Sequence, residues 1–231
     1  MADNVTVVFL HGAGTGPWIW QRVRAAIPVA SEAIAVPSRQ ENASPEACAA
    51  AIVAELNDKG IDRVFVVMHS LAGILAPELG KRLGDRLAGT VFLSAVVPPP
   101  GKRFVDVMGF PNGFVLRMLF KFNPRGLKPS SKMLRSELCS DLSEEDTVTL
   151  IDRYEAEWPG LYLAPVGAAT YSHRPTYIKL LDDRSVRPRL QDRMIQGLPD
   201  PHVVTLDAGH MAMLSRPDDL GKHVMQVIES T

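Results

Sequence analysis

Short apolar segments rich in β-branched residues alternate with segments of helical pattern along most of the chain. Segments that are apolar on both faces are typical of buried parallel strands. Where such strands alternate with helices, the strands form one sheet with helices on both faces. The sequence therefore predicts an α/β fold with a mainly parallel sheet of about six strands, at residues 5–10, 33–36, 63–68, 90–96, 176–181 and 203–206.

Helix signals lie between these strands. Residues 44–46, Ser-Pro-Glu, combine an N-cap, a proline at the first helical position and an early acid, and Gly60 ends the helix that they begin. A second helix is expected to follow Ser70 and to reach about Leu83. A third is expected over residues 217–229, because Pro217 is followed by two acids.

The alternation is interrupted in the middle of the chain. The run Pro-Pro-Pro-Gly at residues 98–101 can continue neither a strand nor a helix, and the segment after it is rich in Phe, Met and Leu. Ser143, followed by three acids, predicts the start of a helix that reaches about Trp158. Long insertions at the carboxyl edge of such a sheet commonly cover ligands. We therefore predict an α/β core of residues 1–98 and 176–231, with a helical lid of residues 99–175 inserted after the strand that ends near Val96.

Composition excludes several classes of protein. The chain has 25 Lys and Arg against 26 Asp and Glu, a net charge of −1, so no basic surplus attracts nucleic acid or an acidic membrane. No apolar run reaches the ~18 residues of a membrane span, and Asp3 stands where a signal peptide has positive charge. The two cysteines, Cys48 and Cys139, can form neither a disulfide framework nor a four-ligand zinc site. We expect a cytoplasmic protein with no nucleic-acid, membrane or metal partner.

The strongest local motif is Val-Val-Met-His-Ser-Leu-Ala-Gly at residues 66–73. Here a buried strand leads into Ser70 and then directly into a helix. A sharp strand-to-helix turn strains the serine backbone and exposes its Oγ above the sheet, as a nucleophile requires. Small residues are favoured two positions before and after the serine, which Ala72 satisfies and Met68 does not. The alternative interpretation is a serine that only caps the helix.

A glycine-rich loop, Leu-His-Gly-Ala-Gly, follows the first strand at residues 10–14. Its glycines allow the backbone to approach a substrate and to direct an N–H group at a developing oxyanion. A dinucleotide-binding loop is the alternative, but Gly12, Gly14 and Gly16 have the wrong spacing. Pro17 also removes a donor where a phosphate-binding helix would begin, and no acid follows the next strand.

Two further candidates follow the last two strands. The segment Asp-Ala-Gly-His, residues 207–210, places His210 at the same edge of the sheet as Ser70. Asp182 and Asp183 end the preceding strand, and one of them can accept a hydrogen bond from the imidazole. Asp183 is preferred because it lies further into the loop, with Asp182 as the alternative. Serine, acid and histidine, each at the end of a later strand than the one before, follow the chain order of the triad in α/β hydrolases.

With these motifs, the chain resembles the α/β-hydrolase superfamily over essentially its whole length. It is most similar to the branch of plant methylesterases and hydroxynitrile lyases, with their bacterial esterase relatives. The resemblance implies Ser70 as nucleophile, His210 as base, Asp183 as acid, and the N–H groups of Ala13 and Leu71 as the oxyanion hole. The family usually has glycine where this chain has Met68 and Ala72. The matching segments are residues 9–13, 18–20, 69–71, 90–93 and 209–217.

Two positions separate ester hydrolysis from cyanohydrin cleavage in the branch that the chain resembles. The lyases place a Lys just after the catalytic His, where its charge stabilises the leaving cyanide, and a Thr near the oxyanion loop. This chain has Met211 and Gly12 at those places, and neither offers a charge or a hydroxyl. The resemblance therefore favours a serine carboxylic-ester hydrolase that forms an acyl-enzyme and needs no cofactor.

The apolar side chains of the predicted lid favour small apolar or aromatic esters as substrates. The same site used as a lyase, thioesterase, lactonase or perhydrolase is an alternative, and a non-catalytic ligand receptor on this scaffold is another. A homodimer is compatible with the sequence, which does not require one. The expected substrate-binding residues are Gly12, His69, Phe104, Phe110, Met118, Trp158 and Met211.

Overall fold

The computed structural model describes residues 5–169, 171 and 173–230, so Asp3, which entered the expectation about a signal peptide, lies outside the described residues. Six strands, all parallel, form one sheet in the order β2-β1-β3-β4-β5-β6. This arrangement confirms the predicted α/β fold. The strands are β1 (Val5–Leu10), β2 (Ser31–Ile34), β3 (Arg63–His69), β4 (Leu87–Leu93), β5 (Thr176–Leu180) and β6 (His202–Leu206).

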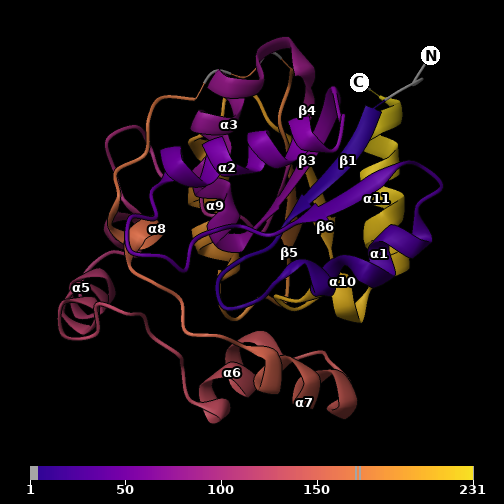
Figure 1. The fold of residues 1–231 in the computed structure, drawn as a ribbon. Helices are drawn as coiled ribbons and strands as arrows, with labels where there is room; N and C mark the ends of the chain where they lie inside the picture. The colour runs from indigo at the N-terminus through magenta and orange to yellow at the C-terminus, as the bar shows by residue number, and fades with distance from the viewer. Residues whose placement is uncertain (1–4, 170, 172, 231) are drawn as a thin grey trace.

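Both faces of the sheet are buried, because successive side chains of a strand point to opposite faces. In β1, Val8 and Leu10 pack into one core cluster, whereas Val7 and Phe9 pack into the other. Helices α2 (Pro45–Asp58), α3 (Ala76–Leu83) and α9 (Pro188–Gln196) cover the first face (Figure 1). The second face is covered by η1 (Pro17–Trp20), α1 (Gln21–Ala26), α10 (Ala212–Ser215) and α11 (Pro217–Glu229).

The predicted helix starts follow from local chemistry. Ser44 Oγ accepts a hydrogen bond from the Ala47 N–H at 3.1 Å and Pro45 occupies the first turn of α2. The helix expected after Ser70 consists of a 3₁₀ segment, η2 (Ser70–Leu75), followed by α3. A further 3₁₀ turn, η3 (Gly84–Arg86), leads into β4.

In the described part of the chain, none of the helices has the length and apolarity that a bilayer crossing requires.

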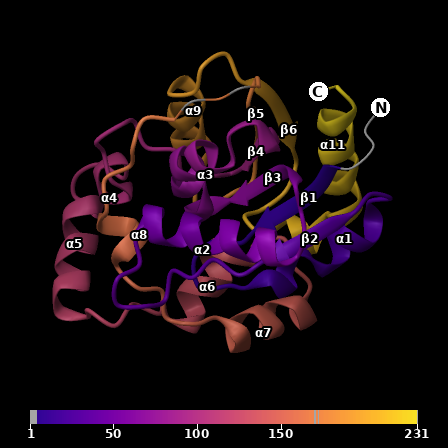
Figure 2. The ribbon, with the colours of Figure 1, turned by 45° about the horizontal axis from the view of Figure 1, so that its top comes forward.

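The segment between β4 and β5 is helical, as expected. Leu134, Leu138 and Leu150 of this segment pack into the core cluster on the α11 side of the sheet, whereas Leu161 packs into the cluster on the α2 side. The insertion is therefore anchored to both faces at the carboxyl edge (Figure 2). Its helices are α4 (Phe104–Val107), α5 (Asn112–Phe122), α6 (Ser131–Leu138), α7 (Glu144–Arg153) and α8 (Gly160–Leu163).

Several predicted boundaries were wrong, three of them for a clear structural reason. The strand expected to end near Val96 ends at Leu93, because Ser94 has a φ of +41° and turns the chain out of the extended conformation. The second strand covers residues 31–34 rather than 33–36, because its partner β1 ends at the residue that pairs with Ile34. The helix expected to reach Trp158 ends at Arg153, where Tyr154 adopts an extended backbone.

Helix η2 passes very close to the chain that follows β4. A Cβ atom added to Gly73 would lie 2.6 Å from the Val96 carbonyl oxygen and 2.9 Å from Ala95 Cβ. The small residue that this turn requires is therefore Gly73, three positions after Ser70, in addition to the fully buried Ala72.

Replacing Gly73 with alanine should lower the free energy of unfolding by about 2 kcal/mol, because the methyl group overlaps the backbone of Val96 in the chain that follows β4. Urea denaturation measures this change. Gly167→Ala is the matched control, since the nearest atom to its added Cβ is 3.7 Å away, and its change should stay within about 0.5 kcal/mol. Equal effects at both positions would contradict the close approach.

Candidate active site

The turn between β3 and η2 holds Ser70 in an unusual backbone conformation. Its φ is +52°, in the left-handed region that residues other than glycine rarely adopt. The strained conformation that a strand-to-helix turn predicts is thus present at Ser70. The Val96 N–H donates a 2.9 Å hydrogen bond to the Ser70 carbonyl oxygen and holds the turn. Ser70 is partly exposed, whereas Leu71 and His69 on either side are buried.

The glycine-rich loop after β1 lies against this turn. A Cβ atom added to Gly12 would lie 2.8 Å from Ser70 Cβ and 3.1 Å from His69 Nδ1, so position 12 has no space for a side chain. Among the described residues, the Ala13 N–H meets no acceptor. Leu71 is the second residue of η2, so its N–H belongs to the first turn, where the helix supplies no acceptor. Both N–H groups are therefore available to an oxyanion.

Asp183 and His210 form a buried pair. Asp183 Oδ2 lies 2.7 Å from His210 Nδ1, and the two residues are 2% and 4% exposed. The same oxygen accepts a 2.6 Å hydrogen bond from Ser94 Oγ, and Oδ1 accepts 2.8 Å bonds from the N–H groups of Ser185 and Val186. These donors fix the carboxylate, which in turn places the imidazole proton on Nδ1 and leaves Nε2 as an acceptor.

The competing acid, Asp182, is exposed. Its backbone N–H donates to the Ala208 carbonyl oxygen at 3.1 Å. The structure thus pairs the histidine with Asp183, the aspartate that lies one residue further past β5.

His69 connects the serine turn to the histidine loop. His69 Nε2 lies 3.0 Å from the His210 carbonyl oxygen and donates to it, and the two ring centroids are 4.6 Å apart. Complete burial, and to a smaller degree the neighbouring His210, lower the pKa of His69 well below its usual value, so this ring is neutral. Ser70 Oγ and the His210 ring are not hydrogen bonded in this structure. Asp183 and His210 are therefore joined, and His69 links the loop of His210 to the turn that holds Ser70.

His11 holds residues 10–14, the predicted oxyanion loop, in place. Its Nε2 accepts a 2.9 Å hydrogen bond from the Val36 N–H, so Nδ1 carries the proton and donates to the Gly12 carbonyl oxygen at 2.8 Å. Burial lowers the pKa of His11 to about 4, and the nearby Arg39 contributes in the same direction. A neutral imidazole therefore ties the loop to the chain that follows β2.

Two carboxylates of the helical insertion hold the loops of the site, and sequence reasoning identified neither. Glu157 Oε2 accepts a 2.7 Å hydrogen bond from the Gly14 N–H and lies 3.3 Å from Arg39 Nε. Asp141 Oδ2 accepts 2.7 Å bonds from the Gly209 N–H and Ser215 Oγ. In the sequence, Glu157 and Asp141 are only single acids in segments that are otherwise apolar or that cap a helix. Such a pattern does not predict hydrogen bonds to loops that are distant in the chain.

The Tyr154 ring completes the contact with the oxyanion loop. A Cβ atom added to Gly14 would lie 1.9 Å from Tyr154 Cζ, and Gly14 has a φ of +70°, so both space and backbone require glycine there. The Glu155 N–H donates to the Gly14 carbonyl oxygen at 2.9 Å. Residues 154–157 therefore cover the loop directly.

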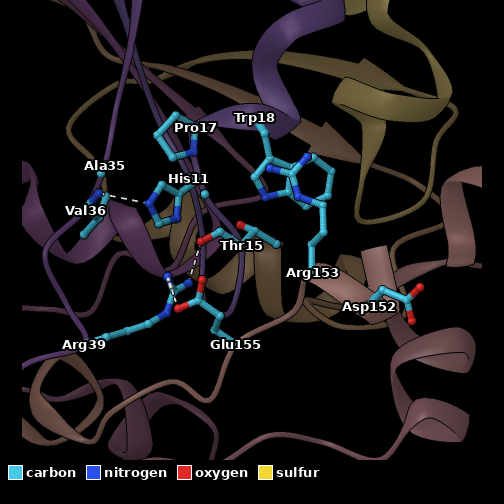
Figure 3. Close-up of a pocket in the computed structure, with 11 residues that line it drawn as sticks. His11, Thr15, Pro17, Trp18, Ala35, Val36, Arg39, Asp152, Arg153 and Glu155 are labelled. Carbon is cyan, nitrogen blue, oxygen red and sulfur yellow. Dashed lines mark hydrogen bonds and ion pairs between the residues drawn. The ribbon is translucent and has the colours of Figure 1, made fainter. Parts of the chain in front are cut away.

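A cavity of about 480 Å³ is lined by His11 and Thr15 of this region, by Arg39, and by residues 152, 153 and 155 of the insertion (Figure 3). Figure 3 shows Arg39 reaching Thr15 and Glu155, and the Arg153 guanidinium lies 4.3 Å from the centre of the Trp18 ring. Ser70, Asp183 and His210 are not among its lining residues. The cavity therefore does not include these three residues.

The residues expected to bind substrate divide into two groups. Gly12 and His69 adjoin Ser70, and Met211, 1% exposed, follows His210 directly. In the insertion, Phe104 packs edge-on against the Tyr162 ring at 4.7 Å between centroids, and Phe110 is 90% exposed. The other two expected residues, Met118 and Trp158, are partly buried.

Residues 7–222 match the family described as "Alpha/beta hydrolase family". The chain belongs to the alpha/beta hydrolase family. The predicted family and the predicted enzyme class, a hydrolase, are confirmed.

Individual relatives show which kinds of family member the chain is similar to. A probable hydrolase, R7, of Phoma sp. is 30% identical over 178 residues, which cover 71% of this chain and 69% of that protein. A probable esterase, PIR7A, of Oryza sativa subsp. indica is 28% identical over 250 residues and covers 92% of each chain. The crystal structure of a methylesterase of Arabidopsis has a TM-score of 0.75 at 20% identity, covering 98% of this chain and 100% of that one. The chain is thus similar to plant methylesterases and esterases, as expected.

The neutral His11 predicts a pH dependence of stability. Its pKa is about 4 in the folded protein and about 6.5 in the unfolded chain, so acid protonates the unfolded state first. The stabilisation is complete above about pH 6.5 and is lost as the pH falls to about 4, for a total of about 3 kcal/mol. Urea unfolding across this window should show a shallower pH dependence for His11→Gln than for wild type. The exposed His202→Gln is the control, and an unchanged slope in His11→Gln would refute the role of His11.

Glu157→Gln should lower the free energy of unfolding by about 2 kcal/mol, because it removes one charge of a largely buried ion pair with Arg39. Glu155→Gln is a close control: its carboxylate also lies near Arg39, at 3.5 Å, but its side chain is 69% exposed. Its loss should not exceed about 0.5 kcal/mol. Thermal and urea unfolding measure both variants, and similar losses would show that burial of Glu157 contributes little.

Proposed function

We propose that the protein is a serine carboxylic-ester hydrolase in which Ser70 is the nucleophile, His210 the base and Asp183 the acid. The observation that carries the proposal is the Asp183–His210 hydrogen bond of 2.7 Å, buried at the same edge of the sheet as the strained Ser70. A solvated aspartate–histidine pair is common on protein surfaces, whereas a buried pair with four donors on its carboxylate is positioned for proton transfer.

The reaction begins with the Ser70 hydroxyl proton. His210 Nε2 removes this proton as Oγ attacks the ester carbonyl carbon, and Asp183 stabilises the imidazolium that forms. The hydrogen bond between Oγ and Nε2 forms when substrate binds, since such bonds are often long without substrate and shorten in the complex. The N–H groups of Ala13 and Leu71 hold the tetrahedral oxyanion.

The second half of the reaction regenerates the enzyme. The imidazolium donates its proton to the leaving alcohol, the carbonyl reforms, and the acyl group remains on Ser70. His210 then activates a water molecule, which hydrolyses the acyl-enzyme and releases the acid. Because losing one oxyanion donor in comparable sites lowers kcat by about 10²–10³-fold, the position of the loop that carries Ala13 matters nearly as much as the side chains of the triad.

The contacts of Gly12 and Met211 favour ester hydrolysis over cyanohydrin cleavage. At position 12, the space that a threonine would need is occupied by the Ser70 side chain, whose Cβ would lie 2.8 Å from a Cβ atom added to Gly12. After His210, the buried Met211 supplies no positive charge for leaving cyanide. The names of the rice and Arabidopsis relatives, an esterase and a methylesterase, also support an ester substrate.

The helical insertion, residues 99–175, is proposed to act as a lid over a core formed by residues 1–98 and 176–231. Its contacts through Tyr154 and Glu157 lie directly on the oxyanion loop. Phe104 and Trp158 are proposed to give the lid its preference for small apolar or aromatic esters.

Ser70→Ala should lower the turnover of p-nitrophenyl acetate by at least about 10⁴-fold, because no other group at the turn can form the acyl-enzyme. A fluorophosphonate probe should label the wild type and not this variant. Ser44→Ala, which removes the N-cap of α2, should retain turnover.

Undiminished turnover in Ser70→Ala would remove Ser70 from the mechanism. An unlabelled wild type would favour a receptor, and faster turnover of a cyanohydrin or thioester than of any ester would favour another use of the site.

A further inference from the structure

Helix α5 presents an apolar face to solvent. Phe114 and Phe122 are 59% and 73% exposed, and Val115 and Leu119 are 50% and 46% exposed. At about 100° per residue, residues 114, 118 and 122 form one line along the helix, and residues 115 and 119 form the line beside it. The outward half of the helix is therefore a continuous apolar strip, which is unusual for a surface helix.

The opposite side of α5 fixes this orientation. A Cβ atom added to Gly113 would lie 1.9 Å from the Val105 carbonyl oxygen, so the helix is pressed against α4. The Phe120 ring is buried, with its centroid 5.0 Å from that of Tyr162, and Arg117 forms an ion pair with Asp106. Because α5 is held through Gly113, Arg117 and Phe120, the apolar strip cannot turn inward without breaking these contacts.

The sequence around the strip is strongly basic. Residues 102–128 contain six Lys and Arg residues and one acid, Asp106, a net charge of +5 in a chain whose total is −1. Lys121 and Arg125 lie in and just after the last turn of α5, and both are exposed. The whole-chain charge, on which the expectation of no membrane partner rested, conceals this local excess.

We propose that α5 and its basic flanks form a docking surface for an anionic lipid–water interface, at which the strip enters the headgroup region and the Lys and Arg side chains contact lipid phosphates. Apolar residues beside basic ones are the pattern of helices that lie in a membrane surface. A peripheral contact of this kind needs no membrane span. A second copy of the chain fits less well, since it would bring two patches of charge +5 together.

Vesicle flotation with the full-length protein tests the proposal. Wild type should float with vesicles of phosphatidylcholine and phosphatidylglycerol at roughly 2:1 and not with phosphatidylcholine alone. The affinity of the double variant Leu119→Gln, Phe122→Gln for the anionic vesicles should be at least about tenfold lower than that of wild type. Raising NaCl from about 0.1 M to about 0.5 M should also weaken binding, because screening reduces the attraction to the headgroups.

A matched control uses exposed apolar residues elsewhere in the insertion. Met133 on α6 and Val148 on α7 are 56% and 46% exposed, and the double variant Met133→Gln, Val148→Gln should bind vesicles as wild type does. Circular dichroism checks that both double variants are folded. Absence of binding to anionic vesicles, or equal loss in both variants, would overturn the proposal. So would a wild-type dimer in sedimentation that becomes monomeric in Leu119→Gln, Phe122→Gln, because the strip would then join two copies of the chain.

Discussion

The parallel direction of all six strands is the constraint on which the candidate site depends. Since every strand ends at the same edge, the loops after β1, β3, β5 and β6 meet there, although they are up to two hundred residues apart in the chain. Gly12, Ser70, Asp183 and His210 each stand in one of these loops. Residues that are common in any protein are thereby brought together as the proposed nucleophile, acid, base and backbone donors.

The loops at that edge are not held by the sheet alone. Glu157 and Asp141 reach from the insertion to backbone N–H groups of the oxyanion loop and of the histidine loop, and His69 links the histidine loop to the serine turn. Backbone N–H groups buried without a partner are costly, so each carboxylate stabilises one loop conformation over others. The insertion therefore contributes to the geometry of the candidate site.

The sequence predicted those parts that depend on local pattern. The strands could be predicted from the sequence because buried parallel strands need apolar residues on both faces. The serine turn and the aspartate loop could be predicted because each follows a strand directly. Ser94 and Glu157 were not predictable, since a hydrogen bond to a residue more than eighty positions away leaves no periodic signal. The end of β4 at Leu93 was missed for a related reason: the left-handed backbone at Ser94 serves its contact with Asp183 and is not imposed by neighbouring residues.

The position of the Tyr154 ring over Gly14 has a consequence for anyone who reshapes this protein. The ring occupies the volume that any side chain at position 14 would need. The residue at position 154 therefore decides which residues position 14 can accept. Libraries that randomise the two codons separately will sample mostly unfolded or misaligned loops. Libraries that combine a smaller residue at 154 with asparagine at 14, which accepts a left-handed backbone, would change the shape of the space beside the candidate site.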